Sequence, residues 1–256
     1  MKVIEKYDYI LSIGTFFEDE DLKNSLQKAC KQVTKFTYMH PIDNFELKTF
    51  YTQFIKYEVG SEEGICALLL DTFVKNCDEK IKEFIQNLDL GYISAESSAG
   101  EEEFEEAYEF YQNSNSKVLI IGKDIKNHER VENIIKLLAT IKKYTDFEVL
   151  VLDEDLQNSL NSCESFDLED IEDLKSFNGT LLYSLVGKDT KVLLASQTFA
   201  NIAKVKDGEN INIISKNENI KRVLKIDENL TGTIAILNVE NIVNEYRYKQ
   251  VKIEKD

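Results

Sequence analysis

The most regular pattern of apolar and polar positions lies between Lys117 and Asp153. Residues 117–121 form a short apolar run, typical of a strand buried on both faces of a sheet. Gly122 ends this run, and Asn127 is the predicted N-cap of an amphipathic helix. Apolar residues then recur at helical spacing: Val131, Ile134, Ile135, Leu138 and Ile141. A second strand is predicted at residues 147–152, and a strand–helix–strand unit of this spacing forms a right-handed parallel crossover in almost every case.

The N-terminal half repeats this pattern. Strands are predicted at residues 8–14 and 35–39, with a helix from about Asp19 between them. A further long helix is predicted after Ser61, with Glu62 and Glu63 in its first turn, where carboxylates complement the helix dipole. The segment that follows is predicted as a loop at 88–100 and an acidic amphipathic helix at 101–111.

The pattern changes in the C-terminal third. Residues 154–178 are acid-rich and contain few large apolar residues, which predicts a linker between two domains. Beyond them apolar and polar residues alternate, as in strands, at 191–195, 210–214, 222–226 and 232–237. We therefore predict an α/β domain at 1–153, an acidic linker at 154–178 and a small β-rich, barrel-like domain at 179–256. The first domain is expected to hold an open, mostly parallel sheet with helices on both faces.

The composition narrows the classes of partner. The 256 residues include 47 acidic and 31 basic side chains, a formal net charge of −16. Such a surface repels phosphates, so neither nucleic acid nor an anionic membrane is an expected direct ligand. No apolar run reaches the roughly 18–20 residues that span a bilayer, so no direct membrane insertion is expected. The first residues lack the apolar segment of a secretory signal, so the cytoplasm is the expected compartment.

The residues that commonly carry chemistry are sparse. Cysteines stand at 30, 66, 77 and 163, with no C-x-x-C pair, and are expected to be small buried hydrophobic residues without bound metal. His40 lies at the carboxyl end of a predicted strand, where α/β sheets place their sites, although a turn residue is the simpler interpretation. His128 is interpreted as a polar surface residue at a helix start. We assign no catalytic residue.

In each of the two predicted strand–helix–strand units, a single glycine ends the first strand. These glycines are Gly14 and Gly122. A dinucleotide fingerprint needs several glycines, because the backbone and the pyrophosphate must touch. Near the first turn, moreover, four carboxylates at residues 18–21 would oppose a phosphate at the helix start. The residues alone therefore argue against phosphate binding there.

Four segments, taken in order, carry a resemblance to known families: residues 8–15, 59–69, 117–153 and 200–211. The first, with the helix that ends at Ala29-Cys30, resembles the third domain of the molybdopterin oxidoreductase fold. The second, Gly60-Ser61-Glu62, resembles the G-[ST]-[DE] helix start of that family. The third is similar to the molybdopterin oxidoreductase-like subunit of the bacterial NADH:quinone oxidoreductase (respiratory complex I). The fourth is similar to the start of the C-terminal β-barrel.

The resemblance implies a complex I subunit or a piece of one. The molybdopterin oxidoreductase-like subunit of complex I begins with a ferredoxin-like region whose clustered cysteines hold iron–sulfur centres, and this sequence has no such clusters. As a rule that subunit carries no molybdenum cofactor, although in molybdenum relatives the G-[ST]-[DE] turn grips the nucleotide end of the cofactor. The expectation is a non-redox structural part, or a truncated or split copy, of this subunit. It would bind other complex I subunits without a cofactor and lie at the cytoplasmic side of the inner membrane.

An alternative stays open, namely a nucleotide- or pterin-binding oxidoreductase domain that completes its site with a partner chain. The candidate cofactor-binding residues under that alternative are Gly14, Thr15, Gly60, Ser61, Glu62 and Gly122. For the docking role, the candidate surface residues are the aromatic pairs Phe16-Phe17 and Phe50-Tyr51, unless these rings fold back onto the sheet.

Overall fold

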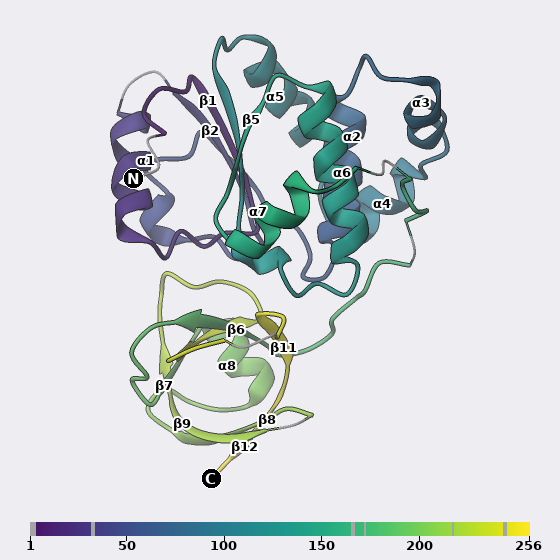
Figure 1. Ribbon diagram of the computed structural model, residues 1–256. Coiled ribbons are helices and arrows are strands. Elements are labelled where there is room, and N and C mark those ends of the chain that lie inside the picture. Colours follow the sequence, from purple (N-terminus) through teal and green to yellow (C-terminus); the bar gives the residue numbers. More distant parts are fainter. Residues whose placement is uncertain (1–3, 32–33, 165–166, 172, 217, 243–244) are drawn as a thin grey trace. The chain divides into compact units, whose positions relative to one another are not determined.

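The computed structural model describes residues 4–31, 34–164, 167–171, 173–216, 218–242 and 245–256 (Figure 1). They form two compact units. Residues 1–41 and 47–176 make up the first, and residues 42–46 and 177–256 make up the second. The predicted fold class, an α/β unit followed by a small barrel-like β unit, is confirmed.

The first unit is built on a five-stranded parallel sheet of order β3-β2-β1-β4-β5. Its strands are β1 (Tyr9–Ile13), β2 (Lys35–Met39), β3 (Gln53–Ile55), β4 (Lys117–Ile121) and β5 (Glu148–Val151). The central strands β1 and β4 are buried along their whole length, as their continuous apolar runs predict.

Helices cover both faces of this sheet (Figure 1). On one face, α1 (Glu20–Cys30) packs Leu22, Leu26 and Ala29 against Ile10, in a core that it shares with Val118 and Ile120. The other face carries the larger core, and its helices are α2 (Glu62–Phe73), α3 (Glu79–Gln86), α4 (Leu90–Ser97), α5 (Glu101–Gln112), α6 (Val131–Tyr144) and α7 (Glu154–Asn161).

Two local predictions in this unit are wrong. The segment predicted as a loop at 88–100 contains α4, because Asp89 accepts a hydrogen bond from the backbone N–H of Tyr92 and Ile93 is buried. Helix α6 begins at Val131 and not beside Asn127, since a 3-10 turn at Lys123–Ile125 occupies the chain after β4.

The domain boundary also differs from the prediction. Residues 154–161 form α7, whose Leu156 and Leu160 are buried in the core of the first unit. Leu174 is buried in the same core, and the first unit extends to Ser176. The predicted linker 154–178 is therefore largely part of the first unit, because its few apolar residues are placed where they can be buried.

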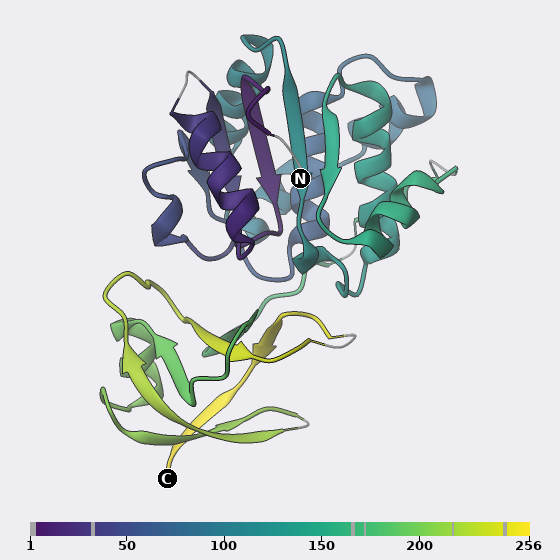
Figure 2. The same ribbon diagram turned by 60° about the vertical axis from the view of Figure 1, so that its left-hand side comes forward.

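The second unit is a nearly closed seven-stranded sheet of order β11-β6-β10-β7-β9-β8-β12, whose strands, green to yellow, curve in Figure 2. Strands β11 (Tyr248–Gln250) and β12 (Lys252–Lys255) stand at opposite ends of this order, yet only Val251 separates them in sequence. The backbone N–H of Val251 donates to the carbonyl of Thr180 at 3.0 Å, so one bent C-terminal stretch borders both ends of the sheet. The remaining elements are β6 (Leu181–Val186), β7 (Val192–Ala195), α8 (Gln197–Ala203), β8 (Asn210–Ile214), β9 (Asn219–Ile226) and β10 (Ile234–Val239).

Limited proteolysis should first cut the chain close to Phe177. Residues 175–179 are exposed or half-buried, whereas Leu174 and Thr180 on either side are buried in separate units. Mass spectrometry of the early products should therefore find fragments of roughly residues 1–177 and 178–256. Early cleavage inside residues 154–161 would instead support a linker there.

Candidate functional site

Open α/β sheets bind ligands outside the carboxyl ends of the strands, at the point where the strand order reverses. In this sheet the reversal lies between β1 and β4, because the chain adds β2 and β3 on one side of β1 and then β4 and β5 on the other. Gly14 and Thr15 follow β1, and Gly122 follows β4. The fold thus brings three of the six predicted residues to the place where a site is expected.

At this place the two turns are in backbone contact. The N–H of Gly122 donates to the carbonyl of Ile13 at 2.8 Å, and the N–H of Asp124 donates to the carbonyl of Gly14 at 3.0 Å. A Cβ atom on Gly122 would lie 1.8 Å from the Gly14 carbonyl oxygen, so only glycine permits this approach. Backbone N–H groups that could otherwise face a phosphate are therefore engaged within the chain.

Side chains reinforce this contact. Lys123 Nζ lies 3.7 Å from Glu18 Oε1, which links the turn after β4 to the turn after β1. Thr15 is buried, and its hydroxyl accepts a hydrogen bond from the N–H of Phe17 at 3.1 Å. Asp19 caps α1 by accepting from the N–H of Leu22. The carboxylates that argued against a phosphate near the start of α1 thus remain beside it.

His40 follows β2 and is buried in contact with Asp124. Its Nε2 lies 3.0 Å from Asp124 Oδ2, and its ring stacks on Tyr38 at 5.6 Å between centroids with an interplanar angle of 9°. The His40 ring also lies 5.6 Å from the ring of Phe16. The interpretation of His40 as a simple turn residue is therefore incomplete, since it ties the end of β2 to the turn after β4.

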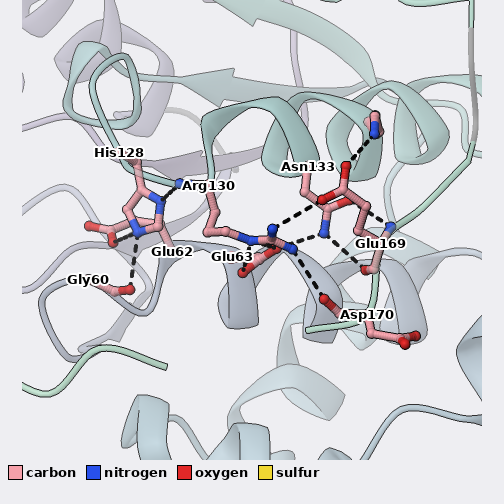
Figure 3. A network of polar contacts seen from close by, with 9 residues as sticks. Gly60, Glu62, Glu63, His128, Arg130, Asn133, Glu169 and Asp170 are labelled. Carbon is pink, nitrogen blue, oxygen red and sulfur yellow. Dashed lines mark hydrogen bonds and ion pairs between the residues drawn. The ribbon is translucent and has the colours of Figure 1, made fainter. Parts of the chain in front are cut away.

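The predicted Gly60-Ser61-Glu62 turn lies at the start of α2, and His128 holds it (Figure 3). His128 Nε2 lies 3.1 Å from the carbonyl oxygen of Gly60 and 3.4 Å from Glu62 Oε2. Its Nδ1 accepts the backbone N–H of Arg130 at 3.0 Å, so the imidazole proton resides on Nε2. The interpretation of His128 as a surface residue is wrong, because the side chain is buried.

Glu63, the next residue of α2, is also buried and paired. Arg130 Nε lies 3.1 Å and 3.3 Å from its two carboxylate oxygens, and Asn133 Nδ2 donates to Oε1 at 2.6 Å. Figure 3 shows the three side chains pointing toward one another between α2 and α6. Of the two adjacent carboxylates predicted in the first turn of this helix, Glu63 is thus paired with a cation and Glu62 lies beside His128.

Burial shifts the acidity of two groups beside these carboxylates. Burial, together with the charges of Glu62 and Asp124, raises the pKa of Tyr57 well above its usual range. Burial first, and then the charges of Glu62 and Glu63, raises the pKa of the Cys66 thiol. Both groups are therefore protonated at neutral pH, and Cys66 is not a thiolate nucleophile.

Two further observations bear on which ligands the site could bind. Among the residues that the structure describes, the hydroxyls of Ser12 and Tyr57 are buried without a hydrogen-bond partner. The same described residues contain no group of three or more His, Cys, Asp or Glu side chains arranged to hold a metal ion. Within them, too, no helix is long and apolar enough to cross a membrane.

The pairings of His40 and His128 could not be found from the sequence. His40 and Asp124 are separated by 84 residues, and His128 and Gly60 by 68. Only the reversal of strand order brings these segments together. The one local signal was the position of His40 directly after a strand.

Comparisons with known proteins support the fold of the chain and say nothing further about it. No family model and no curated protein sequence matches the chain. Among solved structures, the acetylene hydratase from Pelobacter acetylenicus is similar, with a TM-score of 0.57 and 10% sequence identity. The similarity covers 93% of this chain and 71% of the hydratase chain.

Replacing Gly122 by alanine should destabilise the protein strongly. The new methyl group would overlap the Gly14 carbonyl, so the two turns must separate and the hydrogen bonds of Gly122 and Asp124 must lengthen. We expect the free energy of unfolding in urea to fall by about 3 kcal/mol. The matched control is Gly91→Ala in α4, where the nearest atom lies 3.6 Å from the added Cβ. That change should leave stability unchanged or raise it by up to about 1 kcal/mol, and equal losses in both variants would contradict the close backbone contact.

Proposed function

We propose that this chain is a non-redox structural part, or a truncated or split copy, of the molybdopterin oxidoreductase-like subunit of the NADH:quinone oxidoreductase. In this role it supports electron transfer from NADH to quinone by binding other subunits of the complex, and it carries no redox centre itself. Its place would be the cytoplasmic side of the inner membrane, held there through the complex.

One observation carries the proposal, the backbone contact between the turns after β1 and β4. The N–H groups of Gly122 and Asp124 donate to Ile13 and Gly14, at the place where related sheets admit a ligand. The chain thus has the scaffold of a cofactor-binding fold, but its own backbone occupies the place of the ligand. This favours a scaffold role over catalysis.

The G-[ST]-[DE] segment supports the same conclusion. In molybdenum relatives this turn grips the nucleotide end of the cofactor, whereas here Glu62 lies 3.4 Å from His128 and Glu63 is bound by Arg130 and Asn133. A nucleotide that engaged either carboxylate would have to displace these partners. The resemblance therefore supports a common origin with a nucleotide-binding turn. It gives less support to nucleotide binding by this chain.

The negative net charge favours proteins as partners, and the spacing of the cysteines argues against an iron–sulfur cluster. With a net charge of −16, the chain is poorly suited to nucleic acids and anionic lipid surfaces. The four cysteines stand far apart in the sequence, at 30, 66, 77 and 163, whereas iron–sulfur clusters need several thiolates grouped in space.

The aromatic pairs expected to provide a docking surface are not available for it. Phe17 is buried, and Phe16 packs beside the ring of His40. Tyr51 stacks on Tyr38, and Phe50 packs against the same core. These rings fold back onto the sheet, so a docking surface must be sought elsewhere on the chain.

The alternative, a nucleotide- or pterin-binding domain that completes its site with a partner chain, has one observation in its favour. All six candidate residues lie in the two turns after β1 and β4 or at the start of α2, where His40 and His128 also gather. A partner chain that opened the contact between Gly14 and Gly122 would recreate a ligand crevice there.

The proposal is tested by tagging the chain in its own host and separating solubilised membranes on a native gel. The tagged chain should comigrate with NADH dehydrogenase activity, because its role requires stable contacts within the complex. An unrelated acidic protein with the same tag serves as the control and should migrate alone. Migration of the tagged chain as a free protein, apart from that activity, would contradict the proposal.

A further inference from the structure

A short segment without helix or strand crosses the helices of the first unit after α7. We call it the strap and define it as residues 167–171 and 173–175. Leu168 and Ile171 are half-buried against the larger core, and Leu174 is buried in it. Because the strap belongs to no helix or strand, its release would break no element of regular structure.

An asparagine side chain binds the strap through its backbone. Asn133 Oδ1 accepts the N–H of Glu169 at 3.0 Å, and Asn133 Nδ2 donates to the carbonyl of Glu169 at 3.1 Å. The Asn133 amide is fixed for this task, since its Nδ2 also donates to the buried Glu63. Two reciprocal bonds to one residue recognise an extended peptide of any sequence, because every residue except proline offers both groups.

Two further side chains reach the strap backbone. Arg130 donates to the carbonyl of Asp170 at 3.2 Å, and the Tyr92 hydroxyl accepts the N–H of Leu174 at 3.1 Å (Figure 3 shows the first). These contacts, like those of Asn133, do not depend on the side chains of the strap. The surface is therefore built to hold a peptide main chain.

Two strap side chains supply selectivity. The carboxylate of Glu169 lies between Arg130 Nη1 at 3.1 Å and Lys136 Nζ at 2.6 Å. Leu174 fills the space beside Gly64, where an added Cβ would lie 2.7 Å from the leucine Cδ1. The two cations thus recognise a glutamate. The space left by the missing side chain of Gly64 in α2 accepts a leucine five positions later.

We infer that this strap-docking surface, formed by Gly64, Tyr92, Arg130, Asn133 and Lys136, is an exchangeable peptide-binding site. Its occupant in a complex is an extended acidic–apolar segment of a partner protein, with a glutamate and a leucine at the spacing of Glu169 and Leu174. The strap occupies the surface in the free chain and is displaced by that segment. This inference stands apart from the proposed role in complex I, since it rests only on contacts within the first unit.

Charge and exposure favour such an exchange. Arg130 and Lys136 of the surface both contact the strap carboxylate Glu169, and Lys80 of α3 pairs with Asp167, on a chain whose net charge is −16. Arg130 also pairs with the buried Glu63, and Glu129 pairs with Lys175 of the strap, so the attraction for an acidic segment is centred on Glu169. The Glu169 side chain is 46% exposed, and exposed ion pairs stabilise weakly. The ion pairs of Glu169 therefore add little to the backbone hydrogen bonds and the buried Leu174, and a partner segment held nearby in a complex can form the same contacts.

The test measures binding of a fluorescent synthetic peptide, residues 167–176, to the full-length chain carrying E169A and L174A in its own strap. The substitutions weaken the strap and leave the docking surface intact, so the peptide should bind this variant by fluorescence anisotropy and bind wild type at least tenfold more weakly. A scrambled peptide should not bind. Absence of saturable binding to the folded variant would overturn the inference.

Matched peptides test the contacts that provide selectivity. A peptide with E169A should bind about three- to fivefold more weakly, and one with L174A at least tenfold more weakly. The matched control D170A should bind like the parent peptide, because the contact of Asp170 with Arg130 uses its carbonyl. A K136A substitution in the protein should reduce the difference between the parent and E169A peptides. Equal affinities for all four peptides would overturn the assignment.

Hydrogen exchange of the wild-type chain gives a second readout that needs no variant and applies if the double variant fails to fold. Excess peptide should accelerate exchange of the Glu169 and Leu174 amides, which lose Asn133 and Tyr92 as partners on displacement. Amides in the centres of α2 and α6 should be unchanged. Strap amides that stay protected at every peptide concentration would show that the strap is a permanent part of the fold and would overturn the inference.

Discussion

The first unit depends on the burial of two adjacent carboxylates, Glu62 and Glu63, at the start of α2. A buried carboxylate is strongly destabilising unless hydrogen bonds and opposite charge compensate it. The helix N-terminus contributes part of this compensation. The segment before α6 adds Arg130, which pairs with Glu63, and His128, whose Nε2 lies 3.4 Å from Glu62 Oε2. Arg130 and Asn133 bind both Glu63 and the strap backbone, so this one buried carboxylate connects α2, the start of α6 and the surface on which the strap lies.

This arrangement connects the fold to the proposed role. The carboxyl end of the sheet retains the strand order and the turns of a ligand-binding fold, but Gly14, Gly122 and the two histidines use those turns for internal contacts. Such contacts stabilise a rigid scaffold in which the N–H groups of Gly122 and Asp124 bond to the chain itself. Under the proposed role the chain would act through its surface, and the strap-docking surface is where we propose that another chain binds.

The sequence predicted the parts of the fold whose signals are local. Strands β1 and β4 are continuous apolar runs ended by glycine, and α1 and α5 have clear apolar faces, so all four were found with their approximate bounds. Helix α4 was missed because its Gly91 and its serines are typical of a loop, although Asp89 is a normal N-cap. Helix α7 and the strap were interpreted as linker because acidic composition outweighed a few well-spaced leucines. The site could be located but not described, since its pairs join residues that only the tertiary fold brings together.

Nuclear magnetic resonance can show whether the carboxyl end of the sheet is closed by the chain itself. The isotopically labelled chain would be titrated with NADH and, separately, with a guanine nucleotide up to millimolar concentration. The amide resonances of Gly14, Gly60 and Gly122 should not move, because their surroundings are filled by internal hydrogen bonds. Saturable shifts centred on these three glycines would contradict this closure and would show that the carboxyl end of the sheet still receives a nucleotide.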